Sequence, residues 1–147
     1  GCIMVEFRRM KAEDVPEISR LEREAFSMPW SEEDFEGMIR SENARYYVAE
    51  KEGAILGGCG LYIVLEEASI TNVVIRREAR NQGVGTELMR HMMEMCGRDG
   101  VKAFTLEVRV SNKAAIHMYE KVGFVSEGIR PGFYEKPAED AMIMWKR

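Results

Sequence analysis

Cysteine is scarce in this sequence, and its scarcity excludes two kinds of protein. The 147 residues include three cysteines, Cys2, Cys59 and Cys96, with no CxxC pair among them. An odd number of widely spaced cysteines argues against a disulfide framework and a structural zinc site, and it favours a reducing cytoplasm. A chain of this length buries roughly 68–70% of its unfolded surface on folding. It therefore needs neither disulfides nor a bound metal to hold its core together.

Long apolar runs and an excess of basic residues are missing as well. No run approaches the roughly 18–20 residues of a membrane-spanning helix, and the N-terminus GCIMVEFRRM lacks the basic-then-apolar order of a signal peptide. The formal net charge of −4 provides no broad basic surface for nucleic acid and suits cationic partners better. The sequence therefore predicts no membrane segment and no direct nucleic-acid partner.

The composition that is present is typical of a globular protein. Hydrophobic residues make up 46% of the chain and charged residues 31%. No linker, internal repeat or low-complexity segment interrupts it. Composition and length together predict a single domain over residues 1–147.

Strand and helix periodicities alternate along the chain. We expect strands at 3–10, in a meander over 45–76, at 101–110, and as a closing pair after 124 around Pro131, Gly132 and Pro137. We expect helices at 12–26, after Pro29, at 84–99 and at 112–122, where Gly123 ends the last one. This order predicts one mixed α/β sheet.

Local signals refine these elements. Asp14 is the expected N-cap of the first helix, and Ser31 with Asp34 resembles a capping box at the start of the second. The middle strand of the meander contains three glycines, Gly57, Gly58 and Gly60. Glycines inside a strand indicate a bulge or a close approach of a neighbouring backbone.

The segment RNQGVGTELMRHMMEMCG, residues 80–97, joins a strand to a helix through Gly83 and Gly85. Unpaired N–H groups at a helix N-terminus, with about half a positive charge, form an anion site. The glycines either let the backbone approach a phosphate, with Arg80 adding charge, or merely make the turn into the helix. A dinucleotide fingerprint would need a third glycine where Leu88 stands, and no GK[ST] sequence follows.

The spacing Arg80-x-x-Gly83-x-Gly85 resembles the [RQ]xxGx[GA] pyrophosphate-binding signature of the GNAT N-acetyltransferase superfamily. The order of elements is similar to that fold from end to end. The resemblance implies acetyl-CoA as co-substrate, and a sheet of about seven strands with four helices whose fourth and fifth strands splay apart. The implied pyrophosphate loop comprises Arg80, Asn81, Gln82, Gly83, Val84, Gly85 and Thr86.

The same resemblance assigns roles to the strand before this loop. The pantetheine arm of CoA would pair with the backbone of Val73 and Ile75 in the fourth strand. The oxyanion donor would be a backbone N–H near Val74.

Three stretches resemble more narrowly the bacterial ribosomal-protein-alanine N-acetyltransferases of the RimI type. They are AFSMPW (25–30), LEVRVSNKAAIHMYEKVGF (106–124) and RPGFYEKPAEDAMIM (130–144). This resemblance implies that the acceptor is the N-terminal alanine of a small-subunit ribosomal protein, presented in a basic tail. The chain departs from many relatives at Arg76 and Arg77, where an Asp-Pro-like pair is frequent, and at Ala79, which replaces a frequent aromatic residue.

Glu107 lies in AFTLEVRV, where Phe104, Leu106 and Val108 alternate with polar residues. Periodicity alone favours a solvated strand glutamate paired with Arg109. The resemblance instead implies that Glu107 is the general base that takes a proton from the acceptor amine. A free glutamate with a pKa near 4.3 is a weak base for an ammonium group, so burial or a relaying water would be required.

Tyr119 and Asn112 belong to the helix that follows. By position alone they are a core tyrosine and an N-cap. The resemblance implies that the Tyr119 phenol is the general acid that protonates the CoA sulfur, and that Asn112 contacts the cofactor. Trp30 and Tyr134 are implied to flank the acceptor groove, and both equally suit hydrophobic lids.

The remaining histidine and cysteine side chains are expected to have structural or solvent-exposed positions rather than catalytic roles. We expect His91 and His117 on solvated helix faces, Cys96 as a buried filler, and no metal site. A group of acidic residues either forms a solvated surface or attracts a basic peptide. It comprises Glu22, Glu24, Glu32, Glu33, Asp34 and Glu36.

The cost of making an amine neutral bears on the acceptor. At pH 7 an α-amino group with a pKa near 7.7–8.0 costs about 1–1.4 kcal/mol to deprotonate, whereas a lysine near 10.4 costs about 4.6 kcal/mol. A protein N-terminus is therefore favoured, although a site can shift these pKa values by several units. Two alternatives stay open: a GNAT enzyme for lysine side chains or small amines, and a non-catalytic CoA-binding module.

Overall fold

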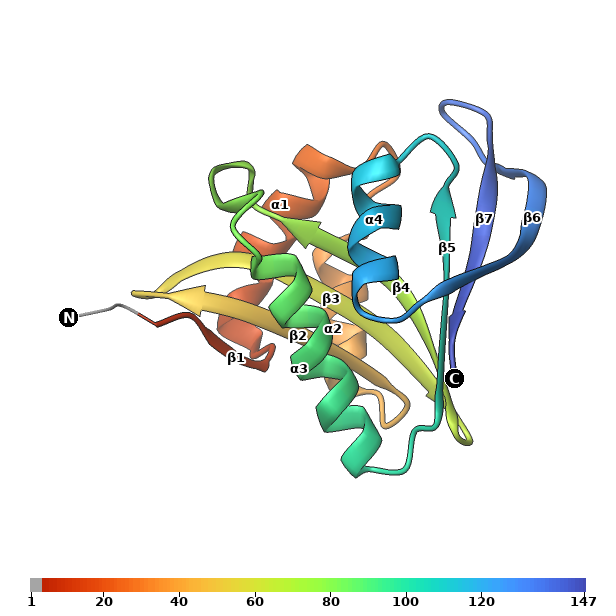
Figure 1. Ribbon diagram of the computed structural model, residues 1–147. Coiled ribbons are helices and arrows are strands. Elements are labelled where there is room, and N and C mark those ends of the chain that lie inside the picture. Colours follow the sequence, from red (N-terminus) through yellow and green to blue (C-terminus); the bar gives the residue numbers. More distant parts are fainter. Residues whose placement is uncertain (1–3) are drawn as a thin grey trace.

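A seven-stranded mixed sheet carries the fold within residues 4–147, the part of the chain that the computed structural model describes (Figure 1). Cys2 and the first residue of the expected strand 3–10, Ile3, lie outside the described residues. The strands are β1 (Glu6–Arg9), β2 (Ala44–Lys51), β3 (Ala54–Val64), β4 (Glu67–Ile75), β5 (Ala103–Arg109), β6 (Val125–Tyr134) and β7 (Glu139–Lys146). The helices of the described part are α1 (Val15–Ala25), α2 (Glu32–Arg40), α3 (Val84–Arg98) and α4 (Lys113–Lys121). The expected mixed α/β sheet is confirmed.

The strands lie in the order β1-β2-β3-β4-β5-β7-β6, and of these neighbours β4 and β5 run parallel while the others run antiparallel. β2, β3 and β4 form the expected meander, with turns at 52–53 and 65–66. α3 provides the crossover between the two parallel strands. Across residues 4–147, no helix combines the length and the apolar character that spanning a membrane requires.

Helices cover both faces of the sheet (Figure 1). α3 and α4 pack on one face, over a core that includes Leu61, Leu88, Met92 and Leu106. α1 and α2 pack on the other face, over a core that includes Ile18, Phe35, Tyr46 and Val48. Alternate residues of a strand therefore enter different cores, as the two-residue period of a strand requires.

The N-terminus of α2 carries the expected capping box. The backbone N–H of Asp34 donates to the Ser31 hydroxyl (3.2 Å), and the backbone N–H of Ser31 donates to the Asp34 carboxylate (2.9 Å). Asp14 occupies the expected N-cap position of α1, but its side chain makes no capping hydrogen bond there. Its carboxylate accepts the Lys11 backbone N–H (2.8 Å) and pairs with Arg8 (2.7 Å), so it ties the turn before α1 to β1 instead.

The closing hairpin differs from the expected one. β6 continues through Pro131 and Gly132 to Tyr134, and the connection to β7 shortens to residues 135–138. Pro131 is tolerated because β6 is an edge strand and its pairing with β7 is interrupted between Arg130 and Tyr134.

The three glycines of β3 make room for neighbouring groups. A Cβ on Gly58 would lie 2.2 Å from a ring carbon of Tyr46, and one on Gly60 would lie 2.4 Å from Oδ1 of Asn72. One on Gly57 would lie 2.5 Å from a β4 carbonyl oxygen. The β3–β4 register also shifts after Gly60, so both expected causes, close approach and a bulge, are present.

Gly58→Ala is expected to lower the free energy of unfolding by about 1–3 kcal/mol, because the added methyl group meets a buried aromatic ring. Gly37→Ala is the matched control. Gly37 lies in α2 with no atom within 4 Å of an added Cβ, so this change should raise stability by up to about 1 kcal/mol. Urea denaturation measures both, and undiminished stability of Gly58→Ala would contradict the close packing at Tyr46.

Candidate active site

The loop before α3 is shaped for an anion. Gly83, the N-cap, has φ +80°, and Asn81 has φ +62°; the left-handed region favours glycine and asparagine. The Gln82 side chain closes the loop on a backbone carbonyl of the preceding turn (3.0 Å). The first backbone bond of the helix runs from Glu87 N–H to Gly83 O (3.0 Å), so the N–H groups of residues 84–86 have no partner within the helix. They lie at the positive end of the helix dipole.

Gly85 is glycine for a different reason. An added Cβ would lie 2.6 Å from Sδ of Met118 in α4 and 3.4 Å from the Ile75 side chain in β4. Gly85 therefore lets the start of α3 lie against both β4 and α4, while Gly83 makes the left-handed turn. Together they place the unpaired amides beside the end of β4.

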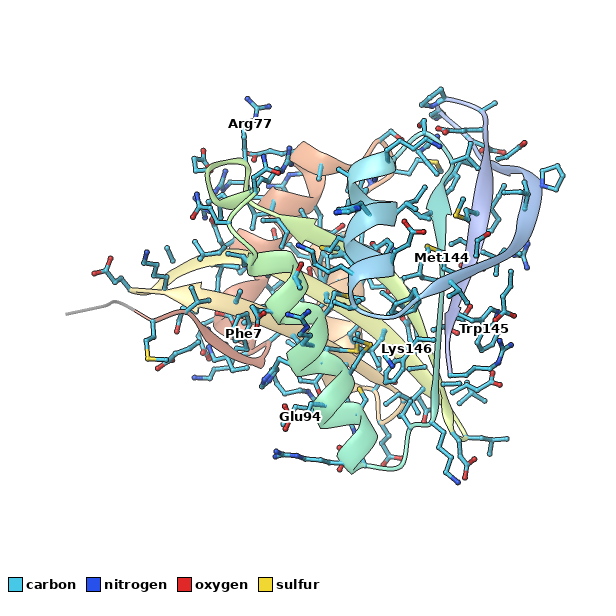
Figure 2. All side chains as sticks on the ribbon, in the orientation of Figure 1. Phe7, Arg77, Glu94, Met144, Trp145 and Lys146 are labelled. Atoms are coloured by element: carbon cyan, nitrogen blue, oxygen red, sulfur yellow. The ribbon has the colours of Figure 1, made fainter. Side chains whose placement is uncertain are left out.

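Three arginines surround this loop, and one is tied to it. The Nε of Arg80 donates to the carbonyl oxygen of Ile75 (3.1 Å), which holds its exposed side chain at the end of β4. Arg77 is exposed and points away from the body of the molecule (Figure 2). Arg76 pairs instead with Glu17 of α1. Arg80 is therefore the cation placed for a ligand of the loop.

β4 and β5 part halfway along their length, as expected for splayed central strands. Their parallel pairing runs from Glu67↔Ala103 to Ile70↔Leu106, so residues 71–75 of β4 have left the partner strand. The two strands diverge at the end of the sheet where α3 begins (Figure 1).

The backbone of β4 beyond this point alternates between β3 and the gap. Arg76 N–H donates to the Leu56 carbonyl of β3 (2.7 Å). Because successive residues of a strand point their backbone groups to opposite sides, Val74 also faces β3, while Val73 and Ile75 face the gap. An oxyanion donor near Val74 stays a prediction, and the backbone groups of β4 that face the gap there are those of Val73 and Ile75.

Glu107 lies on the part of β5 that has left β4. Its side chain is 32% exposed, and its Oε1 lies 3.6 Å from Nη1 of Arg130 in β6. The alternative pairing with Arg109 is wrong, since Arg109 contacts Glu139 (3.2 Å) and two backbone carbonyls. The carboxylate is not deeply buried, so water reaches it. Sequence reasoning missed Arg130, whose partner lies on another strand.

Tyr119 is buried on α4, with 7% exposure. Burial raises the pKa of its phenol above the ordinary value, and nearby Cys59 and Tyr134 raise it further. The phenol therefore keeps its proton at neutral pH. At the start of α4 the Asn112 side chain accepts the Ala115 backbone N–H (3.2 Å), which confirms the expected N-cap.

Tyr134 is the last residue of β6 and packs against Arg109 of β5. Its ring lies under the guanidinium of Arg109, 4.4 Å from the centroid. Burial raises the pKa of the Tyr134 phenol, and the charge of Glu107 adds to the rise. The charge of Tyr134 contributes in turn to the raised pKa of Tyr119.

Trp30 lies on the face of the sheet to which Glu107 belongs. Its ring packs against Tyr62 of β3, with centroids 6.4 Å apart. Tyr62 is in register with Ser69 of β4, which is in register with Thr105 of β5, two residues before Glu107. Side chains two residues apart share a face, so Trp30 borders the face where an acceptor groove is expected.

The expected acidic surface does not include Glu22, which is 1% exposed on the inner side of α1. Its Oε1 accepts from Nδ2 of Asn72 (2.5 Å) and from the Tyr46 hydroxyl (3.3 Å). Burial raises the pKa of this carboxyl group to about 7, against the opposing effect of the two hydrogen bonds. The spacing of Val15, Ile18 and Glu22 places Glu22 on the apolar stripe of α1, a sequence signal that favours burial but does not reveal the partners of the carboxylate.

Glu22→Gln is expected to remove a pH dependence of stability. Because the folded-state pKa is raised from 4.5 to about 7, the contribution of Glu22 is complete below pH 4.5 and is lost as the pH rises through 7. That difference in pKa corresponds to a contribution of about 3 kcal/mol to the free energy of unfolding. The free energy of unfolding of the variant, relative to the parent, should rise by up to this amount between pH 4.5 and pH 8 in urea denaturation. Glu24→Gln, at an exposed ion pair with Arg20, is the control, and a pH-independent difference would contradict the assignment.

Histidine and cysteine offer no second centre in the described part of the chain. Cys96 is buried, and burial raises the pKa of its thiol, which fits the expected filler. His117 is exposed, as expected. The expectation for His91 is wrong: its ring lies 5.7 Å from Phe7 and 5.6 Å from Tyr47. Among residues 4–147 no cluster of histidine, cysteine and carboxylate side chains could hold a metal ion.

Known proteins share this arrangement. Residues 15–124 match the acetyltransferase (GNAT) family. A putative [ribosomal protein bS18]-alanine N-acetyltransferase of Bacillus subtilis (strain 168) is 39% identical over 139 residues, which cover 94% of this chain and 92% of that protein. The [ribosomal protein bS18]-alanine N-acetyltransferase of Escherichia coli (strain K12) is 32% identical over 139 residues, which cover 92% of each.

A solved structure extends the likeness to three dimensions. The crystal structure of the ribosomal-protein-S18-alanine N-acetyltransferase from Escherichia coli matches with a TM-score of 0.89 at 31% identity, over 97% of this chain and 93% of that chain. The parted strands β4 and β5 and the glycine-capped α3 lie within the matched region. By sequence and by fold, the chain belongs to the GNAT family of acetyltransferases.

Proposed function

We propose that this protein transfers the acetyl group of acetyl-CoA to a protein N-terminal α-amino group, with the N-terminal alanine of a small-subunit ribosomal protein as acceptor. One observation carries the proposal. The gap between β4 and β5 is bordered by the amides at the start of α3, by the backbone of Val73 and Ile75 on the side away from β3, and by the strand that carries Glu107.

The residues at the gap fit CoA. The amides of residues 84–86 and the α3 dipole suit a pyrophosphate, and Arg80 adds a charge-assisted contact. The backbone of Val73 and Ile75 faces the gap and suits the amide groups of a pantetheine arm, since strand backbone without a partner strand needs other hydrogen-bond partners. The Ile75 carbonyl already accepts from Arg80 and keeps a second lone pair for the arm. Asn112, at the start of α4, is assigned a further contact. Acetyl-CoA supplies a thioester-activated acetyl group.

Glu107 is assigned the proton of the acceptor amine. Its carboxylate is partly exposed, so a water can carry the proton between the amine and Oε1. Tyr119 is assigned the proton that the leaving sulfur requires. Its phenol holds that proton at neutral pH and can give it to the sulfur as the C–S bond breaks.

Two arguments support a protein N-terminus as acceptor. Deprotonating an α-amino group at pH 7 costs about 1–1.4 kcal/mol, about 3 kcal/mol less than for lysine, which suits a carboxylate base. The relatives from Bacillus subtilis and Escherichia coli carry names that specify the alanine of ribosomal protein bS18. We assign Trp30 and Tyr134 to the walls of the peptide groove, and a basic peptide suits the net charge of −4.

The test incubates the protein with acetyl-CoA and two basic peptides at equal concentration. One has a free N-terminal alanine and no lysine; the other has a blocked N-terminus and internal lysines. Mass spectrometry should locate acetyl groups on the free alanine alone. Acetylated lysine would assign the enzyme to side-chain amines, and transfer to neither peptide, with CoA release from a panel of small amines, would assign it to small molecules. Absence of CoA release with every amine would indicate a CoA-binding module without catalysis.

A further inference from the structure

A buried hydrogen-bond network joins α1 to the middle of β4. Oε1 of Glu22 accepts from Asn72 (2.5 Å) and from the Tyr46 hydroxyl (3.3 Å). The other end of the Asn72 amide, Oδ1, accepts from the Thr71 hydroxyl (2.6 Å). The side chain of Asn72 is therefore held by α1 on one side and by its own strand on the other.

The network lies at an irregularity of β4. The register with β3 passes from Gly60↔Asn72 to Leu61↔Ile70, which leaves Thr71 as an extra residue. Ile70 is also the last β4 residue in register with β5. The bulge thus coincides with the point where the two strands part, and a bulge redirects the strand that contains it.

Neighbouring glycines leave space for the side chains of this network. Gly58 leaves space for the Tyr46 ring, and Gly60 leaves space for the Asn72 amide. A carboxyl group at 1% exposure is costly to bury, and the raised pKa of Glu22 reflects that cost. An apolar residue at position 22 would fill the core of α1 without this cost, so fold stability alone does not account for the glutamate.

We propose that Glu22 is a positioning residue: by holding Asn72 it fixes the bulge of β4, and so aims the backbone of Val73 and Ile75 at the pantetheine arm of CoA. The inference rests on the proposed use of acetyl-CoA. Glu22 touches no reacting group and acts through Asn72, which directly precedes Val73. The pyrophosphate loop has support of its own in the left-handed turn at Gly83, so the amides at the start of α3 depend less on Glu22 than the backbone of β4 does.

Calorimetric titrations with two ligands distinguish binding of the pantetheine arm from binding of the pyrophosphate. CoA carries the pantetheine arm, whereas its nucleotide part, adenosine 3′-phosphate 5′-diphosphate, lacks it. Glu22→Leu removes the acceptor, and misaligned hydrogen bonds to the arm should weaken CoA binding about tenfold. Affinity for the nucleotide part should stay within about twofold, because the α3 N-terminus keeps its shape. Glu22→Gln keeps Oε1 as an acceptor and should bind both ligands as the parent does.

Asn72→Ala removes the donor without touching the helix core, so it tests the same contact if Glu22→Leu fails to fold. It should reproduce the selective loss of CoA affinity. Ser19→Ala is the control, since Ser19 is equally buried on α1 but hydrogen-bonds Arg23 (2.8 Å) rather than β4. Equal losses for both ligands, or no loss of CoA affinity, would overturn the positioning role alone. A parent protein that binds CoA no more tightly than its nucleotide part would overturn the proposed use of acetyl-CoA as well.

Discussion

Glu107→Gln is expected to lower kcat/KM for an alanine-terminated peptide by about 10²–10⁴-fold at pH 7, the usual contribution of a general base. Glutamine keeps the shape of the side chain and a hydrogen-bond acceptor, but it cannot take a proton. The carboxylate of Glu107 is partly exposed on the section of β5 that has left β4, where the acceptor amine is placed by our proposal. Steady-state release of CoA measures the rate.

The pH dependence of this defect gives a second test. An α-amino group with a pKa near 7.7–8.0 loses its proton to solvent as the pH rises toward 9. The difference in kcat/KM between Glu107→Gln and the parent should therefore become smaller at high pH. Glu94→Gln is the control, because Glu94 (Figure 2) is an exposed carboxylate on α3. It pairs with Arg98 at 2.7 Å. Unchanged activity of Glu107→Gln would mean that Glu107 is not the general base and only forms an ion pair with Arg130.

Tyr119→Phe is expected to lower kcat by about 10²-fold or more while the affinity for CoA stays unchanged. The ring stays in place because it packs against Phe124, with centroids 6.0 Å apart. The variant therefore loses the phenolic proton and little else. Stopped-flow acetyl transfer gives kcat, and calorimetric titration with CoA gives the affinity.

Tyr47→Phe is the matched control for this change. Tyr47 is a buried tyrosine of β2, a strand that β3 separates from β4, and its hydroxyl accepts from Arg45 (3.1 Å). It should lose stability by about 1 kcal/mol and keep its kcat. A Tyr119→Phe enzyme with normal kcat would mean that Tyr119 only packs and that the leaving sulfur takes its proton elsewhere.

Features whose causes lie within a few residues were predictable from the sequence. The capping box of Ser31 and Asp34 has both partners within one helical turn, and the left-handed turn at Gly83 depends on that residue alone. The three β3 glycines likewise signalled a close approach, although the sequence does not say that Tyr46 fills the space.

Features that depend on distant partners were not predictable in this way. Glu22 meets Tyr46 and Asn72, which lie 24 and 50 residues away in the chain. Its charge favours a solvated assignment, whereas its place in the apolar stripe of α1 favours burial, and packing decides for the second. Arg130 pairs with Glu107 across strands that are not neighbours in sequence, so no local spacing reveals it.

The candidate site lies between these cases. Periodicity assigns Tyr119 to the core, and the structure agrees, since the residue is 7% exposed. Burial raises the pKa of the phenol and so makes it a weaker acid, and a catalytic role therefore requires that the proton moves only as the strongly basic thiolate forms. The roles of Glu107 and Tyr119 come from the family resemblance, whereas the structure supplies the gap that would bring a ligand to them.

The most direct test of the central claim is the site of acetylation on ribosomal protein bS18 itself. Unacetylated bS18 is incubated with the protein and acetyl-CoA, and its peptides are mapped by mass spectrometry. We predict one acetyl group, on the N-terminal alanine, that is lost with Glu107→Gln. Acetyl groups on lysines beside a free N-terminus, or an unmodified bS18 although the protein binds CoA, would contradict the proposal.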